Sequence, residues 1–371
     1  MISRLNKKNI RRILSFIKVA LTRKTTVKRK WNYFLCGISS VLGLEKSLGN
    51  PLRVIIEPTN ACDQKCPICE TGNGTLGRTK GFMTTRQFNH IVDQMGDTLE
   101  EVFFYFMGEP FLNKDAYKMI RYAADKNIYV NTCTDGNFVK PKELIDSGIS
   151  EVNFQIGGMS QETHETYRVR GKLDKALKTM EEAINYKKQV GGKTKIKLGF
   201  ILMKHNEHEL SKFIDYVEKS GVDDYEIIGS CIRKVEEWDQ FVPSDEKYQI
   251  YDPNEIKKGK IIPKQRPNNY CGELYSATSI QVNGDVVSCC RDPKGNNVLG
   301  NIFEDNFYNS IWNGKKYCRV RHQVNNFSNK LKLCELCPGE GVVHVRDESE
   351  FPNSLEQKND HPQKLSPISE R

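Results

Sequence analysis

Residues 53–69 read RVIIEPTNACDQKCPIC, a short β-branched run followed by a loop with three cysteines, Cys62, Cys66 and Cys69. Three thiolates on one loop can hold three irons of a [4Fe–4S] cubane and leave its fourth iron without a protein ligand. An electron-transfer cluster normally takes four cysteines, and structural zinc takes four ligands, usually as two separated pairs. No fourth Cys or His follows within the loop. The spacing therefore predicts a cluster with one open iron, where chemistry can take place.

A second motif follows one predicted helix later. After a helical pattern over residues 84–99, residues 102–110 read VFFYFMGEP, an apolar run that ends in a Gly-Glu-Pro turn. The two motifs in this order resemble the radical S-adenosylmethionine (SAM) superfamily, whose cluster loop reads CxxxCxΦC, with Φ apolar, and whose second strand ends in a GGEP-type turn. The resemblance implies SAM and a SAM-binding [4Fe–4S] cluster as cofactors.

The resemblance also assigns SAM-binding residues. Ile68 fills the apolar position of the loop and is expected near the adenine of SAM. Gly108, Glu109 and Pro110 are expected at the methionine amino group of SAM. Met107 stands where relatives usually have the first glycine of this turn, so the match is partial there.

Weaker candidates follow other predicted strands. Arg168 resembles an arginine that relatives keep near the carboxylate of SAM or of the substrate, and the alternative is a charge on a helix surface. Asp135 and Asn137 stand where relatives often have a TNG-like turn, and Gln155 where a ribose-contacting Ser or Asp is common. His205 follows the fifth predicted strand, but such a histidine is more often structural or solvated and is not assigned to the site.

Strands and helices alternate beyond the two motifs. Apolar runs typical of strands recur at residues 53–57, 101–106, 127–132, 151–156, 195–203 and 225–228. Helical patterns lie between them, including residues 114–126, 141–147, 173–188 and 209–220. This order predicts an α/β fold with a parallel sheet and right-handed crossovers. The resemblance makes it a partial (β/α)6 TIM barrel, whose active site lies at the carboxyl ends of the strands.

The second half of the chain carries another cysteine set. Cys271 is followed by residues 280–290, IQVNGDVVSCC, which read as a hairpin with an Asn-Gly turn, and Cys334 and Cys337 form a CxxC pair. This part resembles the SPASM/twitch extension of radical SAM enzymes, whose spacing selects Cys289 rather than Cys290 as a ligand. The resemblance implies one auxiliary [4Fe–4S] cluster, although zinc accepts the same ligands. The expected ligands are Cys271, Cys289, Cys334 and Cys337.

The sequence predicts five segments. Residues 1–50 form a basic helical arm, 51–230 the barrel core, 231–270 a linker, 271–345 a small Cys-rich auxiliary-cluster domain, and 346–371 a disordered tail rich in Pro, Ser, Asn and charge. The 12 cysteines show no disulfide-like framework, and the N-terminus shows no signal peptide. A reducing cytoplasm is the expected location.

The arm holds most of the charge imbalance. The chain has a formal net charge of +9, and residues 1–30 contain eleven Lys and Arg and no acid. Apolar residues recur there at helical spacing from Ile10 to Leu21, which predicts an amphipathic helix peripheral to an anionic membrane surface. The apolar stretch over residues 31–44 is too short to span a bilayer. Docking of the arm on the barrel is the alternative. Nucleic acid is not expected, because no RNA-binding module is recognisable.

The resemblance implies an enzyme that reductively cleaves SAM to a 5′-deoxyadenosyl radical, which abstracts a hydrogen atom from its substrate. An auxiliary cluster is suited to accept the electron left on the substrate radical. The expected reaction is therefore oxidation or redox rearrangement of a sugar, a cyclitol or a lipid-linked molecule. Flavodoxin or ferredoxin is the expected electron donor. One alternative is a peptide-modifying (RiPP) maturase, although the basic arm does not resemble a leader-binding domain. Another is a non-catalytic iron–sulfur or metal-binding protein.

Overall fold

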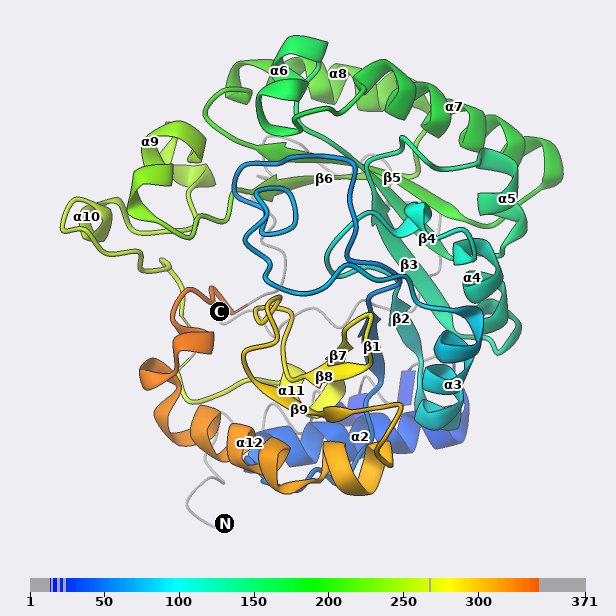
Figure 1. Ribbon diagram of the computed structural model, residues 1–371, viewed down its shortest axis with the longest axis vertical. Coiled ribbons are helices and arrows are strands. Elements are labelled where there is room, and N and C mark those ends of the chain that lie inside the picture. The colour runs from blue at the N-terminus through cyan, green and yellow to red at the C-terminus, as the bar shows by residue number, and fades with distance from the viewer. Residues whose placement is uncertain (1–13, 15, 19–20, 23–24, 267, 340–371) are drawn as a thin grey trace.

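A single sheet of nine strands forms the centre of the molecule (Figure 1). The structure is a computed structural model, and it describes all residues except 1–13, 15, 19–20, 23–24, 267 and 340–371. The strands lie in the order β6-β5-β4-β3-β2-β1-β7-β8-β9. Neighbours from β6 to β7 are parallel, and β7-β8-β9 are antiparallel.

Six parallel strands form the wall of an open barrel. They are β1 (Arg53–Ile56), β2 (Glu101–Phe103), β3 (Tyr129–Thr134), β4 (Glu151–Ile156), β5 (Lys195–Leu202) and β6 (Asp224–Gly229). The helical segments between them are α3 (Thr85–Met95), η2 (Gly96–Thr98), η3 (Pro110–Leu112), α4 (Ala116–Asp125), α5 (Pro141–Asp146), α6 (Gln161–Tyr167), α7 (Leu173–Val190), η4 (Glu207–Glu209) and α8 (Leu210–Ser220). The longer ones cover the outside of the sheet (Figure 1). The predicted partial TIM barrel is confirmed.

The remaining elements flank the barrel. The arm contributes α2 (Val27–Leu42), and the predicted linker contains η5 (Val235–Glu237), α9 (Trp238–Phe241), η6 (Glu246–Tyr248) and α10 (Pro253–Ile256). The Cys-rich part contains α11 (Glu273–Ser276), β7 (Ala277–Ile280), β8 (Asp285–Val287), β9 (Val298–Asn301), η7 (Phe307–Trp312), α12 (Lys315–Phe327), η8 (Ser328–Lys330) and η9 (Lys332–Cys334). Because β7 pairs with β1, the Cys-rich part extends the barrel sheet.

Local sequence explains where the helices begin and end. Thr84 caps α3 in a reciprocal capping box with Gln87. Gly191 and Gly221 end α7 and α8 in the left-handed conformation, with φ of 65° and 78°, which glycine adopts without a steric penalty. Alternate residues of β1, Val54 and Ile56, are fully buried in the core that packs the helices on the sheet.

Charged residues line the inside of the barrel near the amino ends of its strands. Lys197 on β5 is fully buried and forms an ion pair with Glu226 on β6. Its ammonium nitrogen also lies 3.5 Å from Glu151 on β4 and 3.7 Å from Asp224. These contacts tie three neighbouring strands together and leave the carboxyl ends of the strands to the site.

A buried arginine joins the arm to the Cys-rich part. The Arg321 guanidinium lies 4.4 Å from the ring centroid of Trp312 and 4.3 Å from that of Tyr317. It donates to the carbonyl oxygens of Leu274 at 3.0 Å and of Glu45, just after α2, at 3.0 Å. In Figure 1, α2 and α12 accordingly lie along the same edge of the molecule.

Two predicted segments lie wholly or largely outside the described residues: the tail over residues 346–371, and most of the helix from Ile10 to Leu21. Among the helices that the structure does describe, none is long and apolar enough to cross a membrane.

Candidate active site

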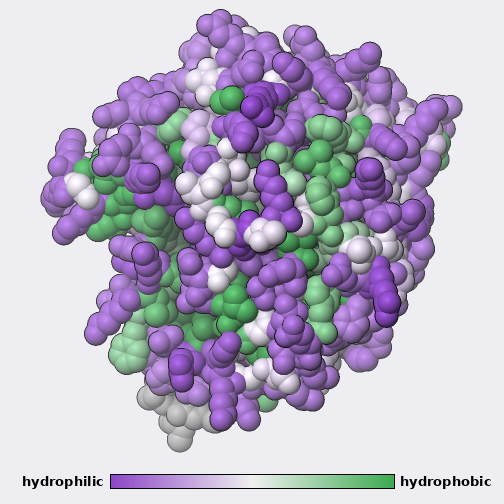
Figure 2. Space-filling view, viewed as in Figure 1, coloured by the Kyte–Doolittle hydropathy of each residue, from purple (hydrophilic) through white to green (hydrophobic). Residues whose placement is uncertain are grey.

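A long loop over residues 57–83, here called the cluster loop, leaves the carboxyl end of β1. Two side chains close its stem. The Thr59 hydroxyl donates to the Gly81 carbonyl at 2.7 Å, and the Asn60 amide donates to the Thr79 carbonyl at 2.9 Å and accepts from the Gly81 N–H at 2.9 Å. In Figure 1 the loop crosses in front of the strands, and in the same view Figure 2 shows a hydrophilic rim around more apolar side chains toward the middle.

The three cysteines stand where this loop folds back on itself. Cys66 is buried, and Cys62 and Cys69 are partly buried. A Cβ at Gly72 would lie 2.5 Å from the backbone nitrogen and oxygen of Cys66, so the returning chain touches the loop there. Ile68 is 8% exposed and packs with Cys66 in an apolar cluster that includes Tyr167, Met203 and Phe241. Burial raises the pKa of the Cys66 thiol to about 11.

The Gly-Glu-Pro turn packs directly on the cluster loop. Gly108 has φ of 82°, and a Cβ there would lie 2.6 Å from the carbonyl oxygens of Thr59 and Ala61. The Glu109 N–H donates to the Ala61 carbonyl at 2.8 Å. Only glycine fits this approach, so the turn and the loop form one unit.

Glu109 is 3% exposed and points toward the end of β3. Its carboxylate accepts from the Thr134 hydroxyl at 2.8 Å, from the Asp135 N–H at 3.0 Å and from the Phe111 N–H at 3.1 Å. Pro110 opens the short η3 and is buried behind the carboxylate. Three donors, two at the end of β3 and one just after the Gly-Glu-Pro turn, therefore hold the Glu109 carboxylate in one orientation.

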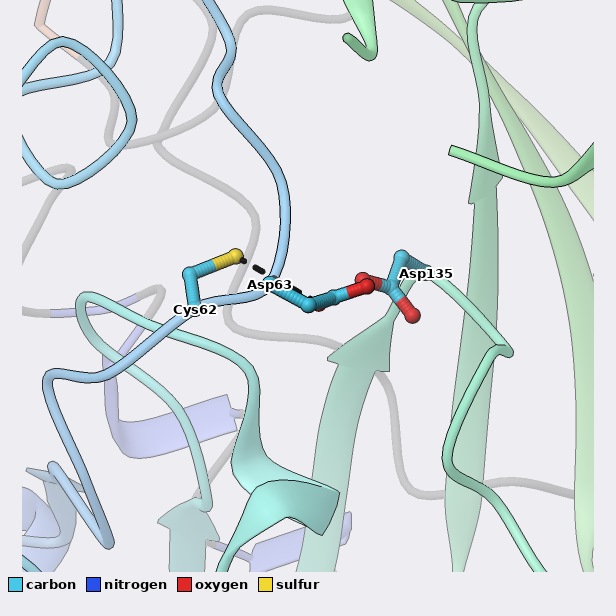
Figure 3. Close-up of side chains that lie close together, drawn as sticks. All are labelled: Cys62, Asp63 and Asp135. Carbon is cyan, nitrogen blue, oxygen red and sulfur yellow. Dashed lines mark hydrogen bonds between the residues drawn. The ribbon is translucent and has the colours of Figure 1, made fainter. Parts of the chain in front are cut away.

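Two further acids gather beside Cys62 (Figure 3). The Cys62 sulfur and carboxylate oxygens of Asp63 and Asp135 lie within 4.8 Å of one another. Burial and the neighbouring charges of Glu109 and Asp63 raise the pKa of Asp135 to about 9, and burial raises the pKa of Glu109 to about 7. Within the described part of the chain, Oδ2 of Asp135 has no hydrogen-bond partner. Carboxyl groups so placed favour a cation between them.

Arg168 lies against the cluster loop and is not a surface charge. It is 8% exposed, and its Nη1 donates to Oε1 of Gln64 at 3.4 Å, whereas its Nε has no hydrogen-bond partner among the described residues. The next carbonyl, of Val169, accepts from the Lys65 N–H at 3.0 Å. The charge of Arg168 lowers the pKa of Cys66, although burial outweighs it.

The second cysteine set gathers beyond the end of β8. The pKa of Cys271 is raised to about 12, by burial first, with a contribution from Cys337; that of Cys334 is raised to about 11, again by burial first, with a contribution from Cys337. The charge of Cys271 contributes to the raised pKa of Cys289, and Cys290, the residue after Cys289, contributes to that of Cys337. All four predicted ligands therefore share one neighbourhood.

Cys290 belongs to this neighbourhood as a fifth thiol. Cys289 and Cys290 share a hydrogen bond that raises the pKa of Cys289 and lowers that of Cys290. The assignment of Cys289 as the ligand stays a prediction. Among the described residues no three of the five sulfurs lie within 4.8 Å of one another, and the same holds for the sulfurs of Cys62, Cys66 and Cys69.

Amide side chains line the barrel below the cluster loop. Asn153 and Gln155 on β4 are 4% and 7% exposed. Oδ1 of Asn153 and both amide atoms of Gln155 have no hydrogen-bond partner in the part of the chain that the structure describes. A Cβ at Gly199 on β5 would collide with both side chains, so the glycine leaves room for them.

Two known protein families match the parts of the chain that contain the two cysteine sets. A sequence profile of the radical SAM superfamily matches residues 56–217, and one of the SPASM iron–sulfur cluster-binding domain matches residues 271–338. The chain therefore carries a radical SAM domain followed by a SPASM domain. SAM, a SAM-binding [4Fe–4S] cluster and an auxiliary cluster are therefore its cofactors.

Two characterised relatives illustrate the range of this superfamily. Mycofactocin maturase MftC of Mycolicibacterium smegmatis is 24% identical over 289 residues, which cover 72% of this chain and 71% of the relative. AdoMet-dependent heme synthase of Methanosarcina barkeri is 26% identical over 135 residues, or 35% of this chain and 38% of the relative.

The fold also matches solved structures. SuiB of Streptococcus suis bound to its precursor peptide SuiA superimposes with a TM-score of 0.57 at 16% identity, covering 84% of this chain and 76% of SuiB. SuiB bound to S-adenosylmethionine gives a TM-score of 0.58 over 90% of this chain and 83% of SuiB. At this identity the likeness concerns the fold.

The residues present fit SAM. The amino acid end of SAM carries two positive groups, an ammonium and a sulfonium. The carboxyls of Glu109 and Asp135 are buried near Cys62, and their charged neighbours are other carboxyls, so this part of the site suits a positive group. Arg168 lies beside Cys66 on the other side of the loop, and its Nε, which has no hydrogen-bond partner among the described residues, suits a carboxylate such as that of SAM. Apolar surface around Ile68 suits an adenine ring.

The Cys-rich part fits an auxiliary cluster. Four thiolates around an iron–sulfur core carry net negative charge. Arg266 and Arg291 both act on Cys337, and Arg266 also acts on Cys334. Cationic side chains beside the thiols therefore offset that charge, as a closed cluster in a partly buried site requires.

Sequence reasoning missed several residues of the site. No motif in the sequence assigns Asp63, Gln64 or the Thr59–Asn60 stem to the site, although all of them adjoin the first cysteine. The one sequence signal for this acidic group is a polar residue directly at a strand end, Asp135. The signal is weak, because the carboxyls that Asp135 meets, those of Asp63 and Glu109, follow other strands. Glu57, just after β1, forms a buried ion pair with Arg78 of the cluster loop, and no sequence pattern predicts that pair.

Proposed function

We propose that this radical SAM enzyme modifies a peptide. The observation that carries the proposal is the relationship to MftC, a maturase, over nearly three quarters of the chain. The fold it shares with SuiB, which was solved with a precursor peptide bound, gives further support. A sugar, a cyclitol or a lipid-linked molecule, which the sequence had favoured, becomes the second candidate.

The barrel lining is compatible with a peptide. Peptide groups offer one donor and one acceptor each, and the amides of Asn153 and Gln155 offer the complementary pair. Both side chains are buried and open to hydrogen bonding, so a bound peptide group would satisfy them. We assign them to the substrate.

The chain's own residues prepare the reaction. In the proposed assignment Cys62, Cys66 and Cys69 hold the SAM-binding cluster, Glu109 and Asp135 hold the ammonium, and Arg168 the carboxylate. When bound, the cofactors supply a 5′-deoxyadenosyl radical that takes a substrate hydrogen atom, and an acceptor for the electron left on the substrate. The cluster loop and the apolar cluster around Ile68 exclude water. A flavodoxin or ferredoxin is the proposed electron donor.

Deuterium transfer tests the substrate class. Candidate precursor peptides encoded near the gene, synthesised with deuterated residues, would be incubated with the anaerobically reconstituted enzyme, SAM and a reductant. We expect deuterium in the released 5′-deoxyadenosine and a peptide that has lost hydrogen. Asn153→Leu and Gln155→Leu should lower this transfer while 5′-deoxyadenosine formed without substrate stays at the wild-type level.

The second candidate has one structural observation in its favour. The described part of the arm exposes the apolar side chains of Leu14, Leu21, Val27 and Trp31, together with basic residues, which suits contact with a membrane, where lipid-linked molecules reside. The same assay distinguishes the two: deuterium that comes from labelled glycolipids and not from any labelled peptide would replace the peptide proposal. The relationship to a heme synthase over a third of the chain shows that small-molecule chemistry occurs among the relatives.

A further inference from the structure

The described part of the arm exposes four large apolar side chains. Leu14, Leu21, Val27 and Trp31 are 58%, 72%, 82% and 60% exposed. Val27 and Trp31 stand one turn apart on α2, and the ring of Trp31 lies 5.4 Å from that of Phe34 at the next turn. We call Leu14, Leu21, Val27 and Trp31 the arm face.

The other side of the same helix is firmly packed. Tyr33, Cys36 and Val41 are buried. Phe16, from the segment before α2, lies 5.5 Å from the ring of Tyr33 and covers Gly37, where a Cβ would lie 2.5 Å from the Phe16 ring. Val27 and Trp31 of the arm face are therefore exposed on a helix, α2, whose opposite side is packed against the rest of the protein.

The anchor places the arm at one end of the barrel. Lys28 forms an ion pair with Asp97 at 2.8 Å, and Arg29 donates to the carbonyl oxygens of Asp97 at 3.2 Å and Asn127 at 3.0 Å. Asp97 and Asn127 precede β2 and β3, so both lie at the amino ends of the strands. The cluster loop lies at the carboxyl ends, which a partner on the arm face would leave free.

We propose that the arm face docks this enzyme on an anionic lipid surface. Residues 1–30 hold eleven Lys and Arg and no acid, and a basic stretch beside exposed apolar side chains is typical of helices that lie in a membrane interface. Tryptophan is the side chain enriched at that interface. A second copy of the chain is a poorer occupant, because it would bring two arms of the same charge together. The inference is independent of the proposed substrate.

Vesicle flotation with the full chain tests the proposal. Vesicles of phosphatidylcholine alone are compared with vesicles that also contain phosphatidylglycerol, at low and high salt. We expect binding to the anionic vesicles only, weakened by salt because the Debye length shortens. The double variant Val27→Ser/Trp31→Ser should lower the partition coefficient about tenfold, and Lys18→Glu about fivefold or more.

Matched controls lie elsewhere on the surface. Val190 is 49% exposed at the end of α7, and Lys193 is exposed after it, so Val190→Ser and Lys193→Glu repeat the two chemical changes away from the arm. Both should bind like the wild type, and iron content and circular dichroism should match in every variant. If the double variant does not fold, Lys18→Glu still tests the proposal, because it changes the charge of the arm and leaves the apolar side chains in place.

Three results would overturn the proposal. The first is equal binding to neutral and anionic vesicles, and the second is no binding to either at low salt. The third is a dimer in solution that Val27→Ser/Trp31→Ser dissociates while vesicles are ignored, which would assign the arm face to a second copy of the chain.

Discussion

At the scale of single residues, Gly108 shows how tightly the turn and the cluster loop are joined. Its positive φ and the two carbonyl oxygens at 2.6 Å from an added Cβ make two separate demands for glycine. Gly74 in the same loop makes only the first demand, because its φ is 78° and nothing lies within 4 Å of an added Cβ. Comparing substitutions at Gly108 and Gly74 therefore distinguishes the effect of backbone strain from that of close contact.

Gly108→Ala should therefore cost more than Gly74→Ala. Each substitution adds strain of about 1 kcal/mol, and at Gly108 the cluster loop must also move away from the turn. We expect Gly74→Ala to keep wild-type iron content and SAM cleavage, and Gly108→Ala to lose most of the SAM cleavage. Equal behaviour of the two variants in iron analysis and in 5′-deoxyadenosine release would show that the contact is unimportant.

Glu109→Gln tests the proposed ammonium site. The amide keeps the size of the side chain and removes the charge, which weakens a charge-assisted hydrogen bond by about 1.5–3 kcal/mol, so the Kd for SAM should rise about ten- to hundredfold. Iron content should be unchanged. The control is Glu143→Gln, at an exposed position on α5. Wild-type SAM affinity in Glu109→Gln, measured by calorimetry on the reconstituted protein, would remove Glu109 from the site.

At the scale of elements, one buried ion pair connects the cluster loop to the auxiliary hairpin. Arg78 donates to both carboxylate oxygens of Glu57, at 2.7 and 2.6 Å, and to the Pro293 carbonyl at 2.8 Å. Glu57, just after β1, also accepts from the Val282 N–H at 2.9 Å. The pair thus holds β1, the cluster loop and the turn between β7 and β8 in one arrangement.

Arg78→Met should destabilise the protein by about 3–5 kcal/mol, because it leaves the fully buried Glu57 without its cation. Removing both charges, in Arg78→Met/Glu57→Met, should recover part of the loss in chemical denaturation. Lys258→Met, which breaks the exposed pair with Glu255, serves as control and should have little effect. A double variant as unstable as the sum of its parts would contradict this account.

Lys197→Met should make stability depend on pH in a defined direction. Burial alone would raise the pKa of Asp224, but Lys197 and Lys195 hold it below its usual value. In the wild type the stabilisation from Asp224 is present above the ordinary carboxyl pKa and is lost as pH falls through the lowered one. Without Lys197 the facing carboxyls repel, and protonation relieves that repulsion.

The deficit of Lys197→Met relative to the wild type should therefore be larger at about pH 8 than at about pH 5. Denaturant titrations of both proteins at the two pH values measure it, with the exposed Lys193→Met as a control. A deficit that is constant or grows toward acid would contradict the assignment of these carboxyls to Lys197.

At the scale of the whole molecule, the barrel and its two cysteine sets followed from sequence because their signals are local. The predicted fourth strand matches β4 residue for residue. By contrast, β2 ends at Phe103 and not at 106, because the chain leaves the sheet to form the turn over the cluster loop. The predicted separate Cys-rich domain shares the barrel sheet through β7, since pairing across more than 200 residues leaves no local trace. Asp63, Glu109 and Asp135 likewise meet only in three dimensions.

SAM cleavage by the reduced protein tests the central claim most directly. The anaerobically reconstituted chain, incubated with dithionite and SAM, should release 5′-deoxyadenosine and contain about eight irons, as expected for two cubanes. Cys62→Ala/Cys66→Ala/Cys69→Ala should release none and keep about four irons. Cys271→Ala/Cys289→Ala/Cys334→Ala/Cys337→Ala serves as the matched control and should still release it. No 5′-deoxyadenosine from the iron-replete wild type, or undiminished release from the variant that lacks Cys62, Cys66 and Cys69, would contradict the account.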